Sequence, residues 1–224
     1  MPHGKSRQHL DQISELTTAR LSVYLRCLDV LDASGVKTVS SQDLAAGFHL
    51  NAAQIRKDLA FFGEFGVRGV GYYVKDLHRH LRQILGLDRT VKVVIMGAGN
   101  LGLALADYPG FRHEGFDIVA LFDSAREKVG QYSRSGVMIR GLKDLDRLIE
   151  REQVDIAVIA VPAEAAQEVA DLVTAAGVRA ILNFSPGTLR VAPHVKLKAV
   201  DLTVSLESLS FFLARGHQHG SADD

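Results

Sequence analysis

The spacing of apolar residues follows a helical period in the first part of the chain and an alternation of strands and helices after about residue 90. Over residues 17–33, leucines recur at intervals of four, three and three, which predicts one face of an amphipathic helix. A short helix over 42–48 and another after Asn51 come next. The glycine-rich stretch 63–74, "GEFGVRGVGYYV", separates short apolar runs and predicts a tight β-hairpin.

After a further predicted helix over 76–87, apolar runs and helical segments alternate along the rest of the chain. The runs span 91–96, 117–122, 154–161 and 179–184, the helical segments between them include 142–152 and 163–176, and Val137 to Ile139 form a further candidate strand. Strands that alternate with helices predict a mostly parallel, doubly wound sheet. The expected fold class is therefore α/β, with a helical module in front of a Rossmann-like sheet.

The first of these strands leads into a glycine motif. In "VKVVIMGAGNLGLALA", Gly97, Gly99 and Gly102 have G-x-G-x-x-G spacing between a strand and a helix. Gly97 allows a tight turn, Gly99 lets the backbone approach a pyrophosphate, and Gly102 permits close helix packing. Asp123 lies 21 residues beyond Gly102, where a carboxylate accepts bonds from an adenosine ribose and repels the extra phosphate of NADP. This predicts an NAD(H) site; the alternative is that Asp123 only caps the next short helix.

The segment after Asn51 has the features of a DNA-reading helix. Asn51 is a helix cap, and Gln54 completes a capping-box pattern three places later. The apolar face consists of Ile55, Leu59 and Phe62, and the opposite face of Ala53, Lys57 and Ala60, with Arg56 beside it. Small residues beside two cations allow close approach to a DNA groove. The alternative is a solvated helix whose charges contact nothing.

The predicted hairpin favours the DNA-reading interpretation. Helix, short helix, helix and hairpin in this order are typical of a winged helix-turn-helix. Arg68 and Gly69 fall at the predicted tip, where one arginine can enter a narrow minor groove. Nearby aromatic side chains are expected to pack between helix and wing, with stacking on single-stranded bases as the alternative. These aromatics are Phe61, Phe62, Phe65, Tyr72 and Tyr73.

Composition narrows the setting of the protein. The net charge is zero, but residues 1–85 hold eleven Lys/Arg against eight Asp/Glu, and residues 86–224 hold fifteen against eighteen. The basic first part permits a partner of negative charge. The single cysteine, Cys27, excludes an internal disulfide, is expected to be a small buried residue, and fits a reducing cytoplasm. The longest apolar run has six residues, far below the roughly 20 of a membrane span, and no signal-peptide pattern opens the sequence.

An enzyme with such a cofactor needs a group that handles the substrate proton, and the candidates include Tyr108, His113 and His194. None stands in a paired arrangement, and both histidines have the surroundings of solvated loop residues. His217 and His219 in the polar tail lack a third ligand at useful spacing, so no metal site is expected. We expect no enzymatic activity. The alternatives are an NAD-dependent oxidoreductase with an N-terminal dimerisation arm and a DNA-binding protein with a vestigial Rossmann domain.

Taken together, the two halves resemble the Rex family of redox-sensing transcriptional repressors. The stretches that carry the resemblance are "QIRKDLAFFGEFGVRGVGYYV", "MGAGNLGLALADYPGF", "FDSAREKVG", "AVPAEAAQ", "ILNFSPGTLRVAP" and "VDLTVSLESLSFFL". The resemblance implies a homodimer that binds double-stranded, pseudo-palindromic operator DNA when NAD⁺ prevails and releases it on binding NADH. It also implies a C-terminal helix exchanged between subunits. Leu202, Leu206, Leu209 and Leu213 offer the apolar stripe for this exchange, and packing on the helix's own subunit is the alternative.

The expected domains follow from these features. They are a winged-helix DNA-binding domain over 1–85, a linker over 86–90, a Rossmann NAD(H)-binding domain with a dimerisation helix over 91–215, and a disordered tail over 216–224.

Individual site residues are assigned from the motifs and the resemblance. The expected cofactor site comprises Gly97, Ala98, Gly99, Asn100, Leu101, Gly102, Tyr108, Asp123, Lys128, Val161, Pro162, Asn183 and Phe184. The expected DNA contacts are Ser41, Asn51, Ala53, Gln54, Arg56, Lys57, Arg68 and Gly69. The resemblance implies that Arg26, Tyr108 and Asp201 couple the cofactor to the DNA-binding domain. Our hypothesis is that reduction removes the positive charge of the nicotinamide and lets these three polar groups pair anew.

Overall fold

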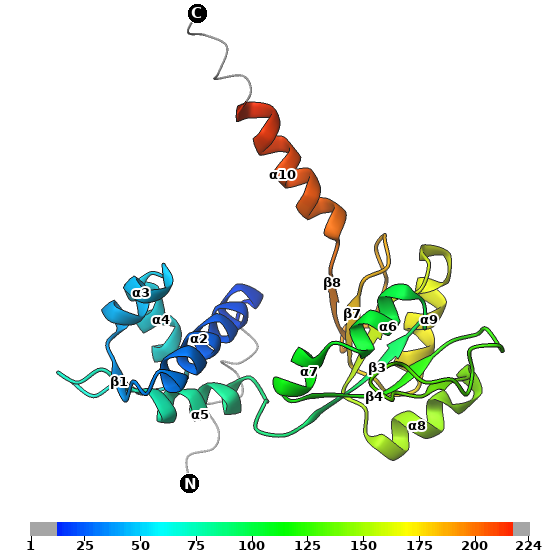
Figure 1. Cartoon of the computed structure of the whole chain (residues 1–224), viewed down its shortest axis with the longest axis horizontal. Coiled ribbons are helices and arrows are strands. Elements are labelled where there is room, and N and C mark those ends of the chain that lie inside the picture. The colour runs from blue at the N-terminus through cyan, green and yellow to red at the C-terminus, as the bar shows by residue number, and fades with distance from the viewer. Residues whose placement is uncertain (1–12, 217–224) are drawn as a thin grey trace, which may run out of the picture. The chain divides into compact units, whose positions relative to one another are not determined.

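The computed structural model describes residues 13–216, and its contacts divide the chain into two compact units, Met1–Arg89 and Thr90–Asp224 (Figure 1). Helices make up most of the first unit, and a parallel sheet with flanking helices makes up the second. Each unit contains a hydrophobic core of its own residues.

Three helices follow one another in the first unit, and each begins at a side-chain cap. They are α2 (Glu15–Ala33), α3 (Ser41–Phe48) and α4 (Ala52–Phe62). The caps are Ser14, Ser40 and Asn51, and the side-chain oxygen of each accepts a hydrogen bond from the backbone N–H three residues later. The predicted succession of helices is confirmed, with α2 and α3 starting one or two residues earlier than expected.

The wing after α4 differs from the predicted hairpin. Strand β2 (Tyr72–Tyr73) pairs antiparallel with β1 (Thr38–Val39), a strand that the sequence pattern did not predict. Inside the predicted hairpin a single bridge joins Val67 and Gly71 across a tight turn. Gly71 has φ +94°, and a Cβ there would lie 2.5 Å from the carbonyl oxygen of Val39, so glycine allows the wing to approach β1.

Two further expectations about this region need correction. Helix α5 (Val74–Ile84) begins two residues earlier than predicted, because Val74 is fully buried and its N–H donates to the carbonyl of Lys37. Phe61 and Tyr73 are each 47% exposed, so the expected packing of these two aromatics was wrong. Tyr73 points away from the core because its strand neighbour Tyr72 points into it.

The core of the first unit joins α2, α3, α4 and α5. Its largest fully buried side chains are Tyr24, Leu21, Leu28, Leu44, Ile55, Leu59, Leu77 and Leu81. Cys27 lies in the same core, as expected, and burial raises the pKa of its thiol. The thiol is therefore protonated and unreactive at neutral pH.

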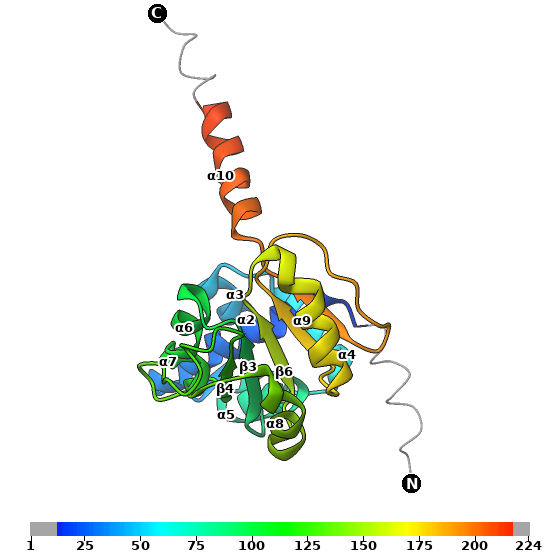
Figure 2. The ribbon, with the colours of Figure 1, turned by 90° about the vertical axis from the view of Figure 1, so that its right-hand side faces the viewer.

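The second unit contains a six-stranded parallel sheet with helices on both faces (Figure 2). The strands are β3 (Val91–Met96), β4 (Phe116–Phe122), β5 (Ile139–Arg140), β6 (Ile156–Ile159), β7 (Ala180–Asn183) and β8 (Lys196–Ala199). The helical segments are α6 (Asn100–Ala106), α7 (Pro109–His113), the 3-10 turn η1 (Leu142–Asp144), α8 (Leu145–Glu152), α9 (Ala163–Ala175) and α10 (Leu202–Gly216). The spatial order β5-β4-β3-β6-β7-β8 is the doubly wound order of a Rossmann fold.

Most of this unit agrees with the predicted alternation. Strands β3, β4 and β7 confirm the predicted runs to within a residue or two, and β6 is shorter than the run over 154–161. Strand β8 was not predicted, because lysines alternate with Leu197 and Ala199 at an edge of the sheet and give no continuous apolar run. Helix α7 was not predicted either, and His113 ends that helix instead of lying in a loop.

Helix α10 exposes its apolar side chains. Its large hydrophobic residues are between 52% and 68% exposed, and they are Leu202, Val204, Leu206, Leu209, Phe211, Phe212 and Leu213. The helix extends to Gly216, one residue into the predicted tail, and residues 217–224 lie outside the described part of the chain. Within residues 13–216, no helix is both long and apolar enough to cross a membrane.

Candidate functional site

The three motif glycines stand at the carboxyl end of β3, and two of them are required by close backbone packing. Gly97 has φ +104°, and a Cβ there would lie 2.6 Å from the carbonyl oxygen of Ala160. A Cβ at Gly102 would fall 3.0 Å from the carbonyl carbon of Gly97 and closer still to its oxygen. Gly99 differs, because no heavy atom lies within 4 Å of its added Cβ. The start of α6 is therefore open to a ligand that approaches its backbone, and it fits a pyrophosphate.

Asp123 follows β4 directly and is tied to the glycine loop. Its carboxylate accepts hydrogen bonds from the N–H of Ala98 at 2.8 Å, the N–H of Ala125 at 2.9 Å and the Nζ of Lys128 at 3.0 Å. Burial opposes ionisation, but these donors outweigh it and hold the pKa of Asp123 below its usual range. A carboxylate has about four acceptor positions, so the three donors leave room for a ribose hydroxyl.

The carboxyl ends of β6 and β7 lie at the same edge of the sheet as the glycine loop. Val161 and Pro162 follow β6, and a Cβ at Gly97 would also lie 3.0 Å from a methyl group of Val161. Asn183 is buried at the end of β7, where its side chain bonds the backbone N–H and carbonyl of Ser185. Ligands of doubly wound folds bind where the strand order reverses, which here is between β3 and β6.

The remaining cofactor candidates occupy the same edge. Asn100 and Leu101 open α6, Leu101 is exposed, and the N–H of Phe184 donates to the carbonyl of Ile159 at 2.9 Å. The structure thus gathers most of the predicted cofactor residues at the carboxyl ends of β3, β4, β6 and β7. Tyr108 is the exception, because it lines a cavity with Phe116 and Ile118 from the start of β4. The polar atoms of Asn183 shape a turn with Ser185, so its side chain has a structural role of its own.

Tyr108 stands at the start of α7 beside a small cavity. Its side chain is 58% exposed, and its ring meets that of Phe111 edge-on at 5.2 Å. The cavity of about 150 Å³ lies under α7 and is lined by Ala106, Asp107, Tyr108, Pro109, Phe111, Arg112, Phe116, Ile118, Ser135 and Val137. A Cβ at Gly110 would lie 2.6 Å from Cζ of Tyr108, so this glycine lets the ring rest over α7.

The other two predicted switch residues belong to different units. Arg26 is exposed on α2 in the first unit, and Asp201 immediately precedes α10 in the second. The Asp201 carboxylate accepts a hydrogen bond from the N–H of Thr203 at 2.8 Å, which makes it the cap of that helix. The pairing of Arg26, Tyr108 and Asp201 stays a prediction.

In the first unit, α4 carries the predicted DNA contacts on its outer side. Ile55 and Leu59 are buried, whereas Ala53, Arg56 and Lys57 are exposed. The predicted faces of the helix are therefore confirmed, apart from Phe62, which is half-buried. The arrangement leaves two cations and a small side chain exposed on the side that can meet a groove.

Hydrogen bonds connect several of the predicted DNA contacts to each other. Arg56 donates to the hydroxyl of Ser41 at 2.8 Å, which joins the start of α3 to α4. Asn51 accepts from the N–H of Gln54 at 3.0 Å, as the cap predicts. The capping box is incomplete, because the Gln54 side chain donates to Asp58 instead of returning to Asn51. The bond from Gln54 Nε2 to the Asp58 carboxylate is charge-assisted, which favours this orientation of the side chain.

The wing carries the last two predicted contacts at its turn. Arg68 and Gly69 are exposed, and Gly69 has φ +82°. The turn is closed by the N–H groups of Val70 and Gly71, which both donate to the carbonyl of Val67. The structure therefore presents Arg68 at the tip of the wing, as predicted.

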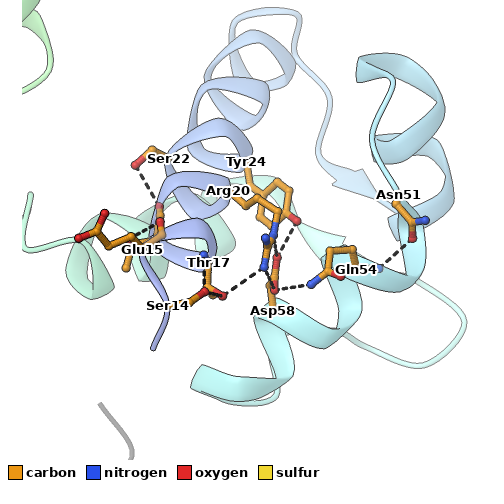
Figure 3. A network of polar contacts seen from close by, with 10 residues as sticks. Ser14, Glu15, Thr17, Arg20, Ser22, Tyr24, Asn51, Gln54 and Asp58 are labelled. Carbon is orange, nitrogen blue, oxygen red and sulfur yellow. Dashed lines mark hydrogen bonds and ion pairs between the residues drawn. The ribbon is translucent and has the colours of Figure 1, made fainter. Parts of the chain in front are cut away.

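A buried carboxylate on α4 is the part of the site that sequence reasoning missed (Figure 3). Asp58 is 4% exposed and accepts from Arg20 Nε at 2.6 Å and Arg20 Nη2 at 2.8 Å. The Tyr24 hydroxyl donates to it at 2.9 Å and Gln54 Nε2 at 2.7 Å. An available signal was the spacing of Arg20 and Tyr24, which puts a cation and a hydroxyl one helical turn apart on α2.

The charges in this cluster stabilise one another. Burial opposes ionisation of Asp58, but hydrogen bonds from Arg20, Gln54 and Tyr24 outweigh it and lower the pKa of the carboxyl. Burial and the bond to Asp58 raise the pKa of Tyr24 to about 12. Asp58 is thus ionised and Tyr24 protonated at neutral pH, which is the state in which all four bonds form.

Two family models match the chain, one in each unit. Residues 12–60 match a model described as a putative DNA-binding protein N-terminus, and residues 88–187 match one described as a CoA binding domain. Coenzyme A and NAD both contain adenosine diphosphate, so the second match agrees with a nucleotide site at the glycine loop. Within the described residues, no cluster of His, Cys, Asp or Glu could hold a metal ion, and His217 and His219 lie outside them.

A winged helix-turn-helix joined to a Rossmann dinucleotide site defines a DNA-binding protein that responds to a nucleotide. The redox-sensing transcriptional repressors Rex of Desulfitobacterium hafniense and Syntrophomonas wolfei are 50% and 51% identical to this chain, covering 89% and 91% of it and 95% and 96% of their own lengths. The chain belongs to the Rex family of redox-sensing transcriptional repressors. Its relatives are repressors, which confirms the expectation that it is not an enzyme.

Solved structures agree with this assignment. RSP in complex with β-NAD⁺ and operator DNA has a TM-score of 0.87 at 37% identity, and RSP in complex with β-NADH has 0.81 at 36%. Each match covers 94% of this chain and 99% of the other. RSP is a Rex-family repressor. The expected fold class is therefore confirmed, whereas the exchange of α10 between subunits stays a prediction.

Proposed function

We propose that this protein is a redox-sensing transcriptional repressor that binds palindromic operator DNA and releases it when NADH binds. One observation carries the proposal: a single Rex-family chain contains both a basic helix exposed for DNA reading and an open glycine loop for a nucleotide. The glycine loop lies beside Asp123, which is ionised. The repressor acts in the cytoplasm, and its activity follows the ratio of NADH to NAD⁺.

The first domain, over residues 1–85, reads the DNA. Helix α4 enters the major groove, where Arg56 and Lys57 contact phosphate or base edges beside the small side chain of Ala53. Arg68 at the wing tip enters the minor groove, where a narrow groove attracts an arginine. The exposure of all four residues supports this assignment.

The second domain, over residues 91–215, binds NAD(H) and is joined to the first through a linker over 86–90. The open space beside Gly99 suits the pyrophosphate, and Asp123 accepts bonds from the adenosine ribose. Lys128, held at 3.0 Å from Asp123, keeps that carboxylate ionised. An ionised carboxylate disfavours NADP, because it repels a phosphate on the same ribose.

Redox sensing requires that the released state bind NADH better than the DNA-bound state does. Reduction removes the positive charge from the nicotinamide while leaving its shape nearly unchanged. Tyr108, Asp201 and Arg26 then pair anew and change the relative orientation of the reading domains. The exposed ring of Tyr108 supports a role at the switch, because an exposed phenol can exchange partners without disturbing the core.

The repressor is a homodimer, and α10 is the element through which its subunits pair. A helix that exposes seven large apolar side chains needs a partner to cover them. A twofold dimer also presents two reading helices, which matches the symmetry of a palindromic operator.

Fluorescence anisotropy with a labelled duplex tests the proposal directly. A duplex enriched from a randomised pool on the full-length chain is titrated alone, with NAD⁺ and with NADH. We expect binding without effector and with NAD⁺, and release at micromolar NADH. Binding that is unchanged by NADH would overturn the redox-sensing function, and a pool that yields no enriched duplex would overturn the DNA-reading function.

A further inference from the structure

One side-chain amide on the reading helix is oriented by a buried charge. Gln54 is the third residue of α4, is partly exposed, and donates Nε2–H to Asp58 Oδ1 at 2.7 Å, one helical turn later (Figure 3). Asp58 cannot turn away, because both of its oxygens are held by Arg20 and one also by Tyr24. Arg20 is itself held by the hydroxyl of Thr17 at 3.1 Å.

This arrangement decides which way the Gln54 amide faces. An ionised carboxylate is an acceptor only, so the NH₂ group must point to Asp58 and a flipped amide would bring two oxygens together. The second N–H and the oxygen Oε1 remain for other partners. They form an adjacent donor and acceptor on one planar group, and its orientation is set before any DNA arrives.

Such a donor and acceptor pair matches one base in the major groove. Adenine presents the acceptor N7 beside the donor N6–H₂, and a glutamine binds both at once. The other polar residues on the outer side of α4 cannot do this, because Arg56 and Lys57 have donors alone. Asn51 cannot either, since its oxygen already caps the helix.

We propose that Gln54 is a specificity-determining residue that reads an adenine in each operator half-site, and that Asp58 is the positioning residue that orients its amide. The inference rests on the proposed DNA-reading function of α4. Arg20 and Tyr24 act through Asp58, so α2 takes part in base recognition without touching the DNA.

The test compares sequence preferences before it compares affinities. Randomised duplex pools are enriched separately on the full-length wild-type chain and on Gln54→Leu, which keeps the side-chain size and removes the amide. We expect one adenine position in each half-site to become degenerate with Gln54→Leu while the other positions persist. If the wild type enriches no duplex, the proposed function fails; if both chains enrich the same sequence at every position, this inference alone is overturned.

Base analogues in the wild-type duplex then identify the atoms that are read. Replacing that adenine by 7-deazaadenine or by purine removes N7 or the N6 amino group, respectively. A bidentate contact is worth about 5- to 150-fold in affinity, so each analogue should weaken the wild type several-fold and leave Gln54→Leu unchanged. Equal losses for both chains would overturn the contact.

Asp58 is tested through the same readout. Asp58→Asn removes the charge that forbids a flipped amide, so we expect weaker discrimination at the Gln54 position with an unchanged salt dependence of binding. Lys57→Ala is the matched control, since it should lower affinity but leave discrimination at the Gln54 position unchanged. If Asp58→Asn does not fold, Tyr24→Phe removes one bond to Asp58 and should reduce the same discrimination by a smaller factor. Full discrimination in the folded variant would overturn the role of Asp58.

Discussion

Replacing Gly102 by alanine tests the close packing of α6 on β3. A Cβ at this position would lie 3.0 Å from the carbonyl carbon of Gly97 and 3.4 Å from Cγ2 of Ile95. These atoms belong to the backbone and to a buried strand, so the helix must move to admit a methyl group. Overpacking of this kind costs about 1–3 kcal/mol, whereas the better helix propensity of alanine returns about 1 kcal/mol.

We therefore expect Gly102→Ala to destabilise the protein by up to about 2 kcal/mol, which lowers Tm by roughly 4–8 °C for a chain of this size. Gly99→Ala is the matched control. Position 99 has φ −82°, which alanine adopts, and no heavy atom lies within 4 Å of the added Cβ. A small loss at the helix cap offsets the gain from a stiffer unfolded chain, so Tm should stay within about 2 °C of the wild type.

Thermal unfolding without ligand, followed by far-UV circular dichroism, separates the two variants. Nicotinamide fluorescence then measures NADH binding in a chain that contains no tryptophan. Gly99→Ala should lose at least about tenfold in affinity, because its methyl group occupies the space that a pyrophosphate needs. Gly102→Ala melting at or above the wild-type temperature would refute the packing argument. NADH binding by Gly99→Ala equal to that of the wild type would refute the placement of the pyrophosphate.

Three further predictions concern the switch, the DNA contacts and the buried charge. Gly110→Ala should displace the Tyr108 ring and raise the NADH concentration needed for operator release, measured by anisotropy, without lowering Tm, measured by calorimetry. An unchanged NADH response would contradict the argument that Gly110 lets the ring lie over α7. Arg56→Ala or Lys57→Ala should each reduce the slope of log affinity against log salt by about one if the contact is to phosphate, and unaltered binding in both would remove α4 from the interface. The pKa of Asp58 is lower in the folded state than in the unfolded chain, so the ionised carboxylate adds to the free energy of unfolding above the unfolded pKa of about 4, and this contribution is lost as pH falls below it. The free energy of unfolding of Asp58→Asn should lack this dependence on pH in acid. Identical pH profiles for the variant and the wild type would contradict the prediction.

Local chemistry made the start of α4 and the glycine loop predictable from the sequence. Asn51 caps α4 through a bond to the residue three places on, which sequence spacing alone specifies. Gly97 and Gly102 are required by backbone contacts that belong to the strand-turn-helix motif itself. Such features depend on neighbours in the chain, so they are visible before the fold is known.

Features that depend on distant partners could not be predicted in the same way. Asp58 lies on α4 in a basic stretch, and its burial becomes evident once Arg20 and Tyr24 are brought to it from α2, 38 and 34 residues away. Strand β1 has two residues and forms because β2 pairs with it. The exposure of Phe61 likewise depends on which side of α4 meets the core.

The order of the two units along the chain has a consequence for synthesis. The helical unit that reads DNA is made first, whereas the sheet is complete only when Lys196–Ala199 has been added beside β7. At about 5–20 residues per second, the ribosome needs roughly 5–20 s to make the intervening chain, and parallel sheets also fold more slowly than helical modules. A nascent chain therefore has one folded DNA-binding unit before it has a complete NAD(H)-binding sheet. Because α10 follows β8 along the chain, we expect the proposed pairing of subunits to wait until the sheet is complete, so that unfinished chains do not occupy operators as dimers.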